Sequence, residues 1–277
     1  GDEWALLQTE AVQIDDGQMV VQAIDESAKF NLNNLLMGKE IQVATSTPTS
    51  TPKFVLSPWY AYFTRLLGNL GLEENLADAV VDWVDEGDER TEPDGAEDST
   101  YRSADPPYLA ANQPFTSISE LSWVAGFGEA EMQALSPYIT ALPVAIGSTN
   151  RRYTRININT ASAMLLRSLS DSDVDSVLLE NMLQSRVATP YSQTGRLVQD
   201  LGIDLKSSDF AQLVDVQSQY FSVQSCARFG RVDYAQQSLL RRFAAVEEVF
   251  VLSRQRRYNC GVNSGPADTI NPTPGDR

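Results

Sequence analysis

The sequence of 277 residues contains no histidine. Imidazole is the general base of Ser-His-Asp and Cys-His catalytic sites, and it is a ligand in most zinc and non-haem iron sites. Its absence excludes these catalytic pairs and nearly all of these metal sites. Most familiar classes of enzyme are therefore poor explanations for this chain.

Cysteine is scarce, and the only two are Cys226 and Cys260. They do not form a Cys-x-x-Cys motif, so they do not indicate a metal or redox site. Two alternatives stay open, one disulfide formed in an oxidising compartment or two unrelated thiols. A disulfide is our hypothesis, because Cys226 falls in the first of three late predicted strands and Cys260 follows the last.

Long apolar runs are also missing. No stretch reaches the roughly 18 residues that a membrane span requires, and no short apolar core after a charged start marks a signal peptide. The chain begins with Gly1-Asp2-Glu3-Trp4 rather than methionine. We therefore expect a soluble chain and leave open an anchor that precedes Gly1.

Positive charge is in short supply. The chain has 21 Lys and Arg against 37 Asp and Glu, which gives a net charge of −16. Such a chain repels duplex nucleic acid and anionic membranes, and it attracts cations and basic partners. The apolar content of 42% and the charged content of 21% are otherwise typical of a globular protein, and the length leaves open a large single domain or a domain with an insertion.

Strand patterns occur at the two ends of the chain. Residues 11–14 and 18–24 flank an Asp-Gly step, which predicts a β-hairpin. Three further strands are predicted at 219–227, 234–242 and 245–253. Because a lone hairpin is marginally stable, we expect both ends to share one sheet, which gives an α+β fold with a helical insertion.

Helical periodicity occupies the middle of the chain, after a Ser/Thr/Pro stretch at 45–52 that predicts a mobile loop. Ser57 and Pro58 predict the start of one helix, and a second is expected over 72–84 with Asp78 in solvent. Asn159 or Thr160 is expected to cap a later helix. The remaining predicted helices are 117–123, 129–135, 161–169 and 173–184.

An acidic segment stands out at residues 82–105, where ten acids and two bases give a net charge of −8. Acids after a helix C-terminus near Val84 meet the negative end of the helix dipole, which favours a bound cation among them. Calcium takes six to eight oxygen ligands and needs neither imidazole nor thiolate. A solvated acidic loop and a pair of catalytic carboxylates are the alternatives, and the EF-hand pattern is absent.

A second motif suggests nucleic-acid binding. Residues 156–162 resemble the entry of helix-hairpin-helix modules, and Arg151, Arg152 and Arg155 lie just before it. The hairpin that follows is Ser170-Asp171-Ser172-Asp173, which would repel phosphate. The Gly126-Phe127-Gly128 turn is followed by acids. We therefore favour a structural packing unit and keep nucleic-acid binding as the alternative.

Six short sequence motifs, taken in their order along the chain, resemble those of a known family. They are Phe30-Asn31-Leu32-Asn33, Asp82-Trp83-Val84-Asp85, Gly95-Ala96-Glu97-Asp98 with Tyr101, Ala111-Asn112-Gln113-Pro114-Phe115, Ser119-Glu120-Leu121 and Asn157-Ile158-Asn159-Thr160-Ala161. Over about residues 1–250 the chain resembles the type II secretion minor pseudopilin K family, also called general secretion pathway protein K.

The resemblance implies a pilin-like α/β domain with an antiparallel sheet, formed by residues 1–33 and 212–277, whose N-terminal anchor helix is missing. A large all-helical domain, residues 34–211, is inserted in it. The insertion comprises a first unit with a calcium loop, 34–145, and a second unit, 146–211, and it contains units similar to SAM and helix-hairpin-helix folds.

The family also implies a role. Its members are non-enzymatic subunits at the tip of the type II secretion pseudopilus, where they join the I-type and J-type minor pseudopilins to initiate and cap the filament for protein export. We thus expect the periplasmic domain of a protein anchored in the inner membrane of a Gram-negative bacterium, with no nucleic-acid partner.

The family binds two calcium ions in its inserted domain. By resemblance, the ligands carried over are Asp85, Asp88, Glu97 and Asp98, with Asp94 and Asp105 in reserve. One departure affects this set, because Gly87 stands where family members often have an acid, and Asp88 comes one place later.

Overall fold

The computed structural model describes residues 11–15, 17–43, 53–91, 93–144, 153–170, 174–202, 213–230, 232–243 and 248–257. The chain divides into two compact units, which we call the helical unit, Asp25–Tyr220, and the sheet unit, Asp2–Ile24 with Phe221–Arg277. The predicted loop at 45–52 and the C-terminal tail lie outside the described residues. No helix in the described ranges has the length and apolar character needed to cross a membrane.

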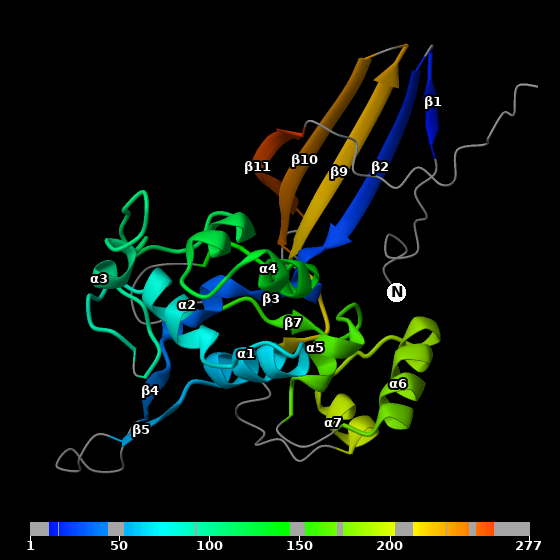
Figure 1. The fold of residues 1–277 in the computed structure, drawn as a ribbon. Helices are drawn as coiled ribbons and strands as arrows, with labels where there is room; N and C mark the ends of the chain where they lie inside the picture. The colour runs from blue at the N-terminus through cyan, green and yellow to red at the C-terminus, as the bar shows by residue number, and fades with distance from the viewer. Residues whose placement is uncertain are drawn as a thin grey trace, which may run out of the picture. The chain divides into compact units, whose positions relative to one another are not determined.

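The sheet unit is built on a five-stranded sheet with the order β1-β2-β9-β10-β11 (Figure 1). The strands are β1 (Val12–Ile14), β2 (Gly17–Asp25), β9 (Tyr220–Phe229), β10 (Val232–Phe243) and β11 (Glu248–Arg257). Antiparallel pairing joins β1 to β2 and β10 to β11, and the arrows of β2 and β9 run in opposite directions. The predicted N-terminal hairpin and the three late strands are confirmed.

The hairpin turn depends on two unusual residues. Asp15 has a positive φ of 47°, which a short polar side chain tolerates in a tight turn. A Cβ atom on Gly17 would lie 2.4 Å from a ring carbon of Phe229 and 2.7 Å from the carbonyl oxygen of Arg228. Only glycine therefore lets β2 approach β9 this closely.

Cys226 lies in β9 and is disulfide-bonded. The other cysteine of the chain, Cys260, lies outside the described residues. Free thiols are not found in the described part of the chain, in agreement with the disulfide hypothesis.

The core of the helical unit forms around α1 (Pro58–Asn69). Pro58 occupies the first helical position after Ser57, as predicted. The ring of Phe30 stacks on Tyr62 and Phe63 at centroid distances of 5.4 and 5.1 Å. These aromatic contacts join α1 to the short strand β3 (Phe30–Asn31), and each ring is fully buried.

Three buried asparagines in β3 and in the following 3-10 helix η3 (Leu32–Met37) tie distant segments together. Asn31 exchanges hydrogen bonds with the backbone of Leu142, and Asn34 does so with Thr154. Asn33 accepts from the Phe115 amide at 2.7 Å and donates to the Phe115 and Leu142 carbonyls. In the motif Phe30-Asn31-Leu32-Asn33, asparagine side chains therefore supply hydrogen bonds to backbone groups that regular strand pairing would otherwise supply.

Helix α2 (Leu76–Val84) packs against η3 and α1. It begins four residues later than predicted, and residues 74 and 75 precede it as a turn. Asp78 was expected in solvent, and this is wrong, because its side chain is buried and accepts hydrogen bonds from Lys39 Nζ at 2.9 Å and Tyr60 Oη at 2.6 Å. These partners precede it by 39 and 18 residues, so helical periodicity does not reveal them.

Short helices continue the helical unit after α2. They are α3 (Asp98–Tyr101), η4 (Ile118–Trp123), α4 (Glu129–Leu135) and η5 (Ser136–Tyr138), followed by β6 (Ile139–Thr140), which pairs parallel with β3. Ser117 and Glu120 form a capping box at the start of η4.

The last part of the helical unit contains β7 (Ile156–Asn157), α5 (Ala163–Arg167), α6 (Ser176–Ala188), α7 (Gly195–Leu201) and β8 (Val214–Asp215). The predicted caps Asn159 and Thr160 are wrong, because Ser162 caps α5. Asn159 instead donates to the carbonyls of Tyr191 and Val216 at 3.0 Å each. Helix α6 starts at Ser176, capped by Asp175, later than predicted.

The expectation that residues 34–211 are all helical needs correction. Strands β4 (Glu40–Val43) and β5 (Lys53–Leu56) pair antiparallel within this range, and β6 and β7 also fall inside it. The four-residue strands are too short to give a clear period of two, and their pairing spans the Ser/Thr/Pro stretch.

Candidate cation site

The acidic segment, residues 82–105, connects the end of α2 with α3 at the left of Figure 1. Its acids lie in different environments. Asp82 and Glu97 are buried, Asp85 and Asp98 are half-buried, and Asp88, Asp94 and Asp105 are exposed. Charge alone therefore does not decide which acids belong to a site.

Glu97 is the unusual member of this set. Its side chain is only 4% exposed, and neither carboxylate oxygen has a hydrogen-bond partner. Burial, followed by the nearby charges of Asp82, Asp85 and Asp88, raises the pKa of Glu97 to about 7. A buried carboxylate without donors is costly, so this position favours either a proton or a cation.

Asp82 forms the floor of the loop and is fully buried. Its carboxylate oxygens accept from the Thr91 amide at 3.0 and 3.2 Å. Burial nevertheless raises the pKa of Asp82, because these hydrogen bonds only partly replace water. A Cβ atom on Gly95 would lie 2.1 Å from Asp82 Oδ2, so only glycine fits there.

Asp85 ends α2 and turns the chain into the loop. Its Oδ1 accepts from the Gly87 amide at 2.9 Å. Burial is the main cause that raises the pKa of Asp85, and the charge of Asp82 adds to it. The charges of the predicted ligands Asp85 and Asp88 thus act on the third, Glu97, and the charge of Asp82 acts on both Asp85 and Glu97.

Asp98 is placed differently from the other predicted ligands. Its Oδ1 accepts from the Ala110 amide at 3.1 Å, and its Oδ2 forms an ion pair with Arg102 at 2.8 Å. Both oxygens are therefore engaged in holding α3 and the chain that follows it. Among the reserves, the Asp94 amide donates to Asp78, and Asp105 is exposed.

Asn112 was not among the predicted site residues. Its side-chain oxygen is buried without a hydrogen-bond partner, and its amide nitrogen lies 3.5 Å from the Gly87 carbonyl oxygen. Its φ is +48°, a left-handed conformation that asparagine tolerates. The sequence did contain a signal for Asn112, because this residue belongs to one of the six motifs that carry the family resemblance.

The described residues contain no group of three or more His, Cys, Asp or Glu side chains placed closely enough to hold a metal ion. The raised pKa of Glu97 reflects charges that act over many ångströms, whereas calcium ligands lie at about 2.3–2.6 Å from the ion. The spacing of the side chains, rather than the raised pKa, is therefore the observation that bears on coordination geometry. In donor chemistry, however, the unpartnered oxygens of Glu97 and Asn112 and the carboxylates of Asp82 and Asp85 are of the kind that a hard cation prefers.

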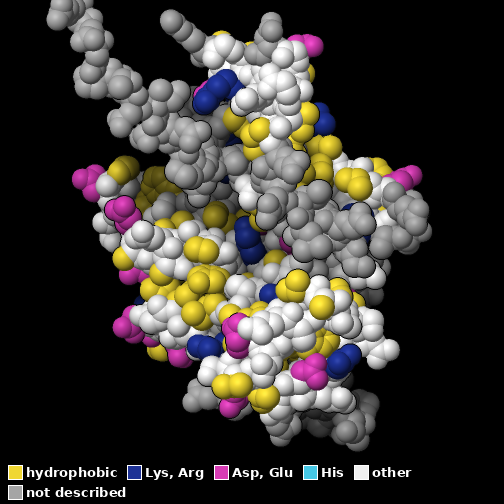
Figure 2. Space-filling model, turned by 90° about the vertical axis from the view of Figure 1, so that its right-hand side faces the viewer, with side chains coloured by type: hydrophobic (Ala, Val, Ile, Leu, Met, Phe, Trp, Pro, Cys, Tyr) yellow, Lys and Arg dark blue, Asp and Glu magenta, His cyan; other side chains and the backbone are white. Residues whose placement is uncertain are grey.

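The motifs that suggested nucleic-acid binding have structural roles. The Gly128 amide donates to Glu131 at 2.9 Å, so an acid occupies the place where a phosphate would bind. Arg155 lies 4.0 Å from Asp215. On the face drawn in Figure 2, basic side chains are scattered singly among acidic and hydrophobic ones rather than gathered into a patch.

Comparison with known sequences finds one family. Residues 28–144 and 156–223 match two profiles, each described as type II secretion system protein K. The chain is 31% identical to type II secretion system protein K of Klebsiella pneumoniae over 254 residues, covering 88% of this chain and 71% of that protein. It is 32% identical to that of Pectobacterium carotovorum, covering 94% and 74%.

A solved structure is also similar. It is the GspK-GspI-GspJ complex of the type 2 secretion system from enterotoxigenic Escherichia coli, in which one chain matches with a TM-score of 0.71 and 27% identity. The match covers 92% of this chain and 85% of that one. It bears out the mixed fold of helices with an antiparallel sheet.

Proposed function

Because the chain belongs to the family of type II secretion system protein K, we propose that it is a non-enzymatic minor pseudopilin at the tip of the type II secretion pseudopilus. The similarity to a chain of the GspK-GspI-GspJ complex carries this proposal. The absence of histidine from the sequence is consistent with a subunit that assembles rather than catalyses.

Assembly with the I-type and J-type minor pseudopilins is the core of the proposed role. In this proposal the chain is the periplasmic domain of a protein anchored in the inner membrane, residues 1–33 and 212–277 form the pilin-like part, and 34–211 are an insertion with helix-hairpin-helix-like units. The pilin-like part contacts its neighbours, and the insertion adds bulk that limits further addition at the tip.

Co-purification tests this role. The intact chain should co-purify with I-type and J-type minor pseudopilins, and a variant lacking 34–211 should still join them but leave pseudopili of uncontrolled length by electron microscopy. Failure of the intact chain to bind either partner would overturn the proposed role. Normal filament lengths with the incorporated deletion would overturn the capping part alone.

Calcium is proposed as a structural ligand of the acidic segment. Glu97 supports this, since it is buried, has no hydrogen-bond donor and lies among acids. Asp85, Asp88 and Glu97 are the proposed ligands, and Asp98 serves only if its contact with Arg102 gives way. A bound cation would neutralise these charges and stabilise the loop.

Nucleic-acid binding remains the alternative from another functional class, and neither the charge nor the structural roles of Arg155 and Gly128 favour it. Labelled duplex DNA at low salt gives a direct measurement. We expect no binding at micromolar protein, and a steep loss of affinity with salt would instead indicate phosphate contacts.

A further inference from the structure

Strand β11 is an edge strand of the five-stranded sheet, and its side chains are open to solvent. All ten of its residues are exposed. It pairs with β10 on one side, and it ends the strand order on the other, so no strand of the described ranges pairs with its outer edge. Such an edge presents a row of backbone donors and acceptors to which another chain can add.

The first half of β11 lacks the protection that edge strands usually carry. Val249, Phe250, Val251 and Leu252 are consecutive and 58, 47, 46 and 42% exposed. Natural proteins commonly place charges or proline on such edges to prevent pairing. Four exposed apolar residues in a row therefore indicate a surface that is covered when the protein functions.

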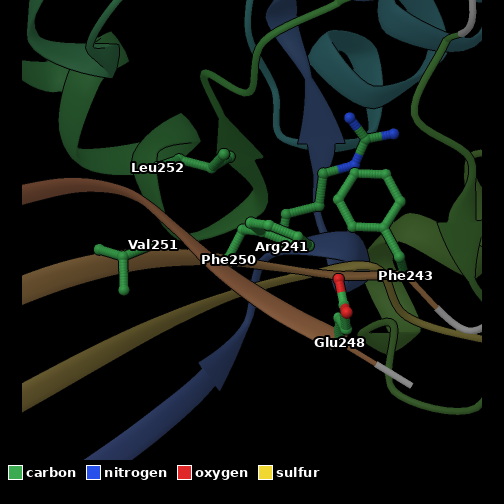
Figure 3. A pocket seen from close by; sticks show the side chains of 6 residues that line it. All are labelled: Arg241, Phe243, Glu248, Phe250, Val251 and Leu252. Carbon is green, nitrogen blue, oxygen red and sulfur yellow. The ribbon is translucent and has the colours of Figure 1, made fainter. Parts of the chain in front are cut away.

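A pocket opens beside this apolar stretch. It has a volume of about 500 Å³, and Arg241, Phe243, Glu248, Phe250, Val251 and Leu252 line it (Figure 3). The rings of Phe243 and Phe250 meet edge to face with centroids 5.4 Å apart, and the Arg241 guanidinium lies 4.3 Å from the Phe243 ring centroid. An apolar side chain that enters the pocket can rest against these two rings, with the charged groups of Arg241 and Glu248 beside it.

A β-bulge shapes the pocket wall. Leu239 pairs with Ser253 and Leu240 with Val251, so Leu252 is the extra residue of β11. A bulge locally bends its strand and re-aims the side chains next to it. Figure 3 shows Leu252 and Val251 on the far side of the pocket from Phe243 and Glu248.

The positive charge of the strands at this edge favours an acidic partner. The described parts of β9, β10 and β11 carry a net charge of +4 within a chain of −16. The charged residues are Arg228, Arg241, Arg242, Arg254, Arg256 and Arg257, with Asp233 and Glu248. Arg256 lies over the Tyr234 ring and Arg257 donates to Gln237, so both guanidinium groups are fixed on the sheet surface.

We propose that β11 is a docking edge for an extended segment of another protein that combines apolar and acidic residues and adds to the sheet as a sixth strand. Backbone pairing supplies affinity, an apolar side chain fills the pocket, and acidic residues face Arg254 and Arg256. This inference does not depend on the role proposed above. A second copy of the chain fits less well, because two β11 strands would bring six arginines together against two glutamates.

Synthetic peptides test the proposal on the intact chain. The probe is a labelled ten-residue peptide in which valine alternates with aspartate, and its control has lysine in place of aspartate. Fluorescence anisotropy should detect the acidic peptide, with affinity that falls as salt rises, and the lysine peptide should bind at least about tenfold more weakly. Two further peptides carry N-methyl groups on one or the other set of alternate amides, and one of them should lose binding because strand pairing needs those donors.

Variants of the chain locate the site. Arg254→Glu and Phe250→Ala should each weaken the acidic peptide by about tenfold, whereas Arg196→Glu, an exposed arginine of α7, should leave it unchanged. Unaltered circular dichroism and melting temperature show that each variant folds. Equal binding of the acidic and lysine peptides, full binding of both N-methylated peptides, unchanged affinity in Arg254→Glu and Phe250→Ala, or no binding at all would each overturn the proposal. A dimer of the chain that Arg254→Glu dissociates would also overturn it, by assigning the edge to a second copy.

Discussion

Glu97 is the residue at which burial and charge conflict most strongly, since both of its oxygens are buried without a donor. Glu97→Gln removes the charge at nearly constant shape. In chelator the free energy of unfolding of the variant should be about 1 kcal/mol higher than that of the parent, because the buried charge is gone. In millimolar calcium the rise in melting temperature seen for the parent should largely vanish.

Glu86→Gln is the matched control, because Glu86 belongs to the same segment but is exposed. It should change neither the stability in chelator nor the response to calcium. Calorimetry or differential scanning fluorimetry measures both. A full calcium response in Glu97→Gln would remove Glu97 from the proposed ligands.

Gly95 tests how tightly the loop closes over Asp82. A Cβ atom there would lie 2.1 Å from Asp82 Oδ2 and 2.5 Å from the Thr91 carbonyl oxygen, so Gly95→Ala should cost about 1–3 kcal/mol. Gly87→Ala is the control, since its nearest contact would be an ordinary 3.4 Å. Urea unfolding of both variants decides the matter, and equal midpoints would contradict this geometry.

At the scale of elements, the short strands and 3-10 helices depend on side chains that replace ladder hydrogen bonds. Asn33 makes three such bonds to Phe115 and Leu142. Asn33→Ala leaves buried backbone groups without partners and should cost about 2–4 kcal/mol. Asn181→Ala, on the exposed side of α6, should change stability by less than about 0.5 kcal/mol.

Denaturant midpoints give both values. A small effect of Asn33→Ala would mean that water replaces its hydrogen bonds.

At the scale of the whole molecule, the pKa values of four acids are shifted in the same direction. Burial raises the pKa of Asp25, Asp82, Asp85 and Glu97. A carboxyl with a raised pKa binds its proton more tightly in the folded chain, so its contribution to stability is complete below its unfolded pKa and is lost as pH rises through its folded pKa. For Glu97 this window runs from 4.5 to about 7.

The melting temperature in chelator should therefore fall between pH 5 and pH 8, and calcium should stabilise more at pH 8 than at pH 5. Sodium chloride at equal ionic strength is the control, because a chain of −16 also gains from simple screening. A melting temperature in chelator that rises over this range would show that other groups outweigh the four acids.

Local pattern determined much of this protein. The hairpin at Asp15, the start of α1 at Pro58 and the cap at Ser117 follow from residues within a few positions of one another, and their energies come from local turns and caps. The acidic segment and the family motifs were likewise legible, and they singled out Glu97, whose pKa the charges of Asp85 and Asp88 help to raise.

Only the tertiary structure decided which polar residues are buried and by whom they are satisfied. Asp78 is buried because Lys39 and Tyr60 reach it, Asp98 is occupied by Ala110 and Arg102, and Thr160 donates to Asp25 rather than capping a helix. Most of these partners lie far away in the chain, and periodicity reports only which face a residue occupies. A polar group can remain in the interior only when such distant partners satisfy it, and packing alone brings them together.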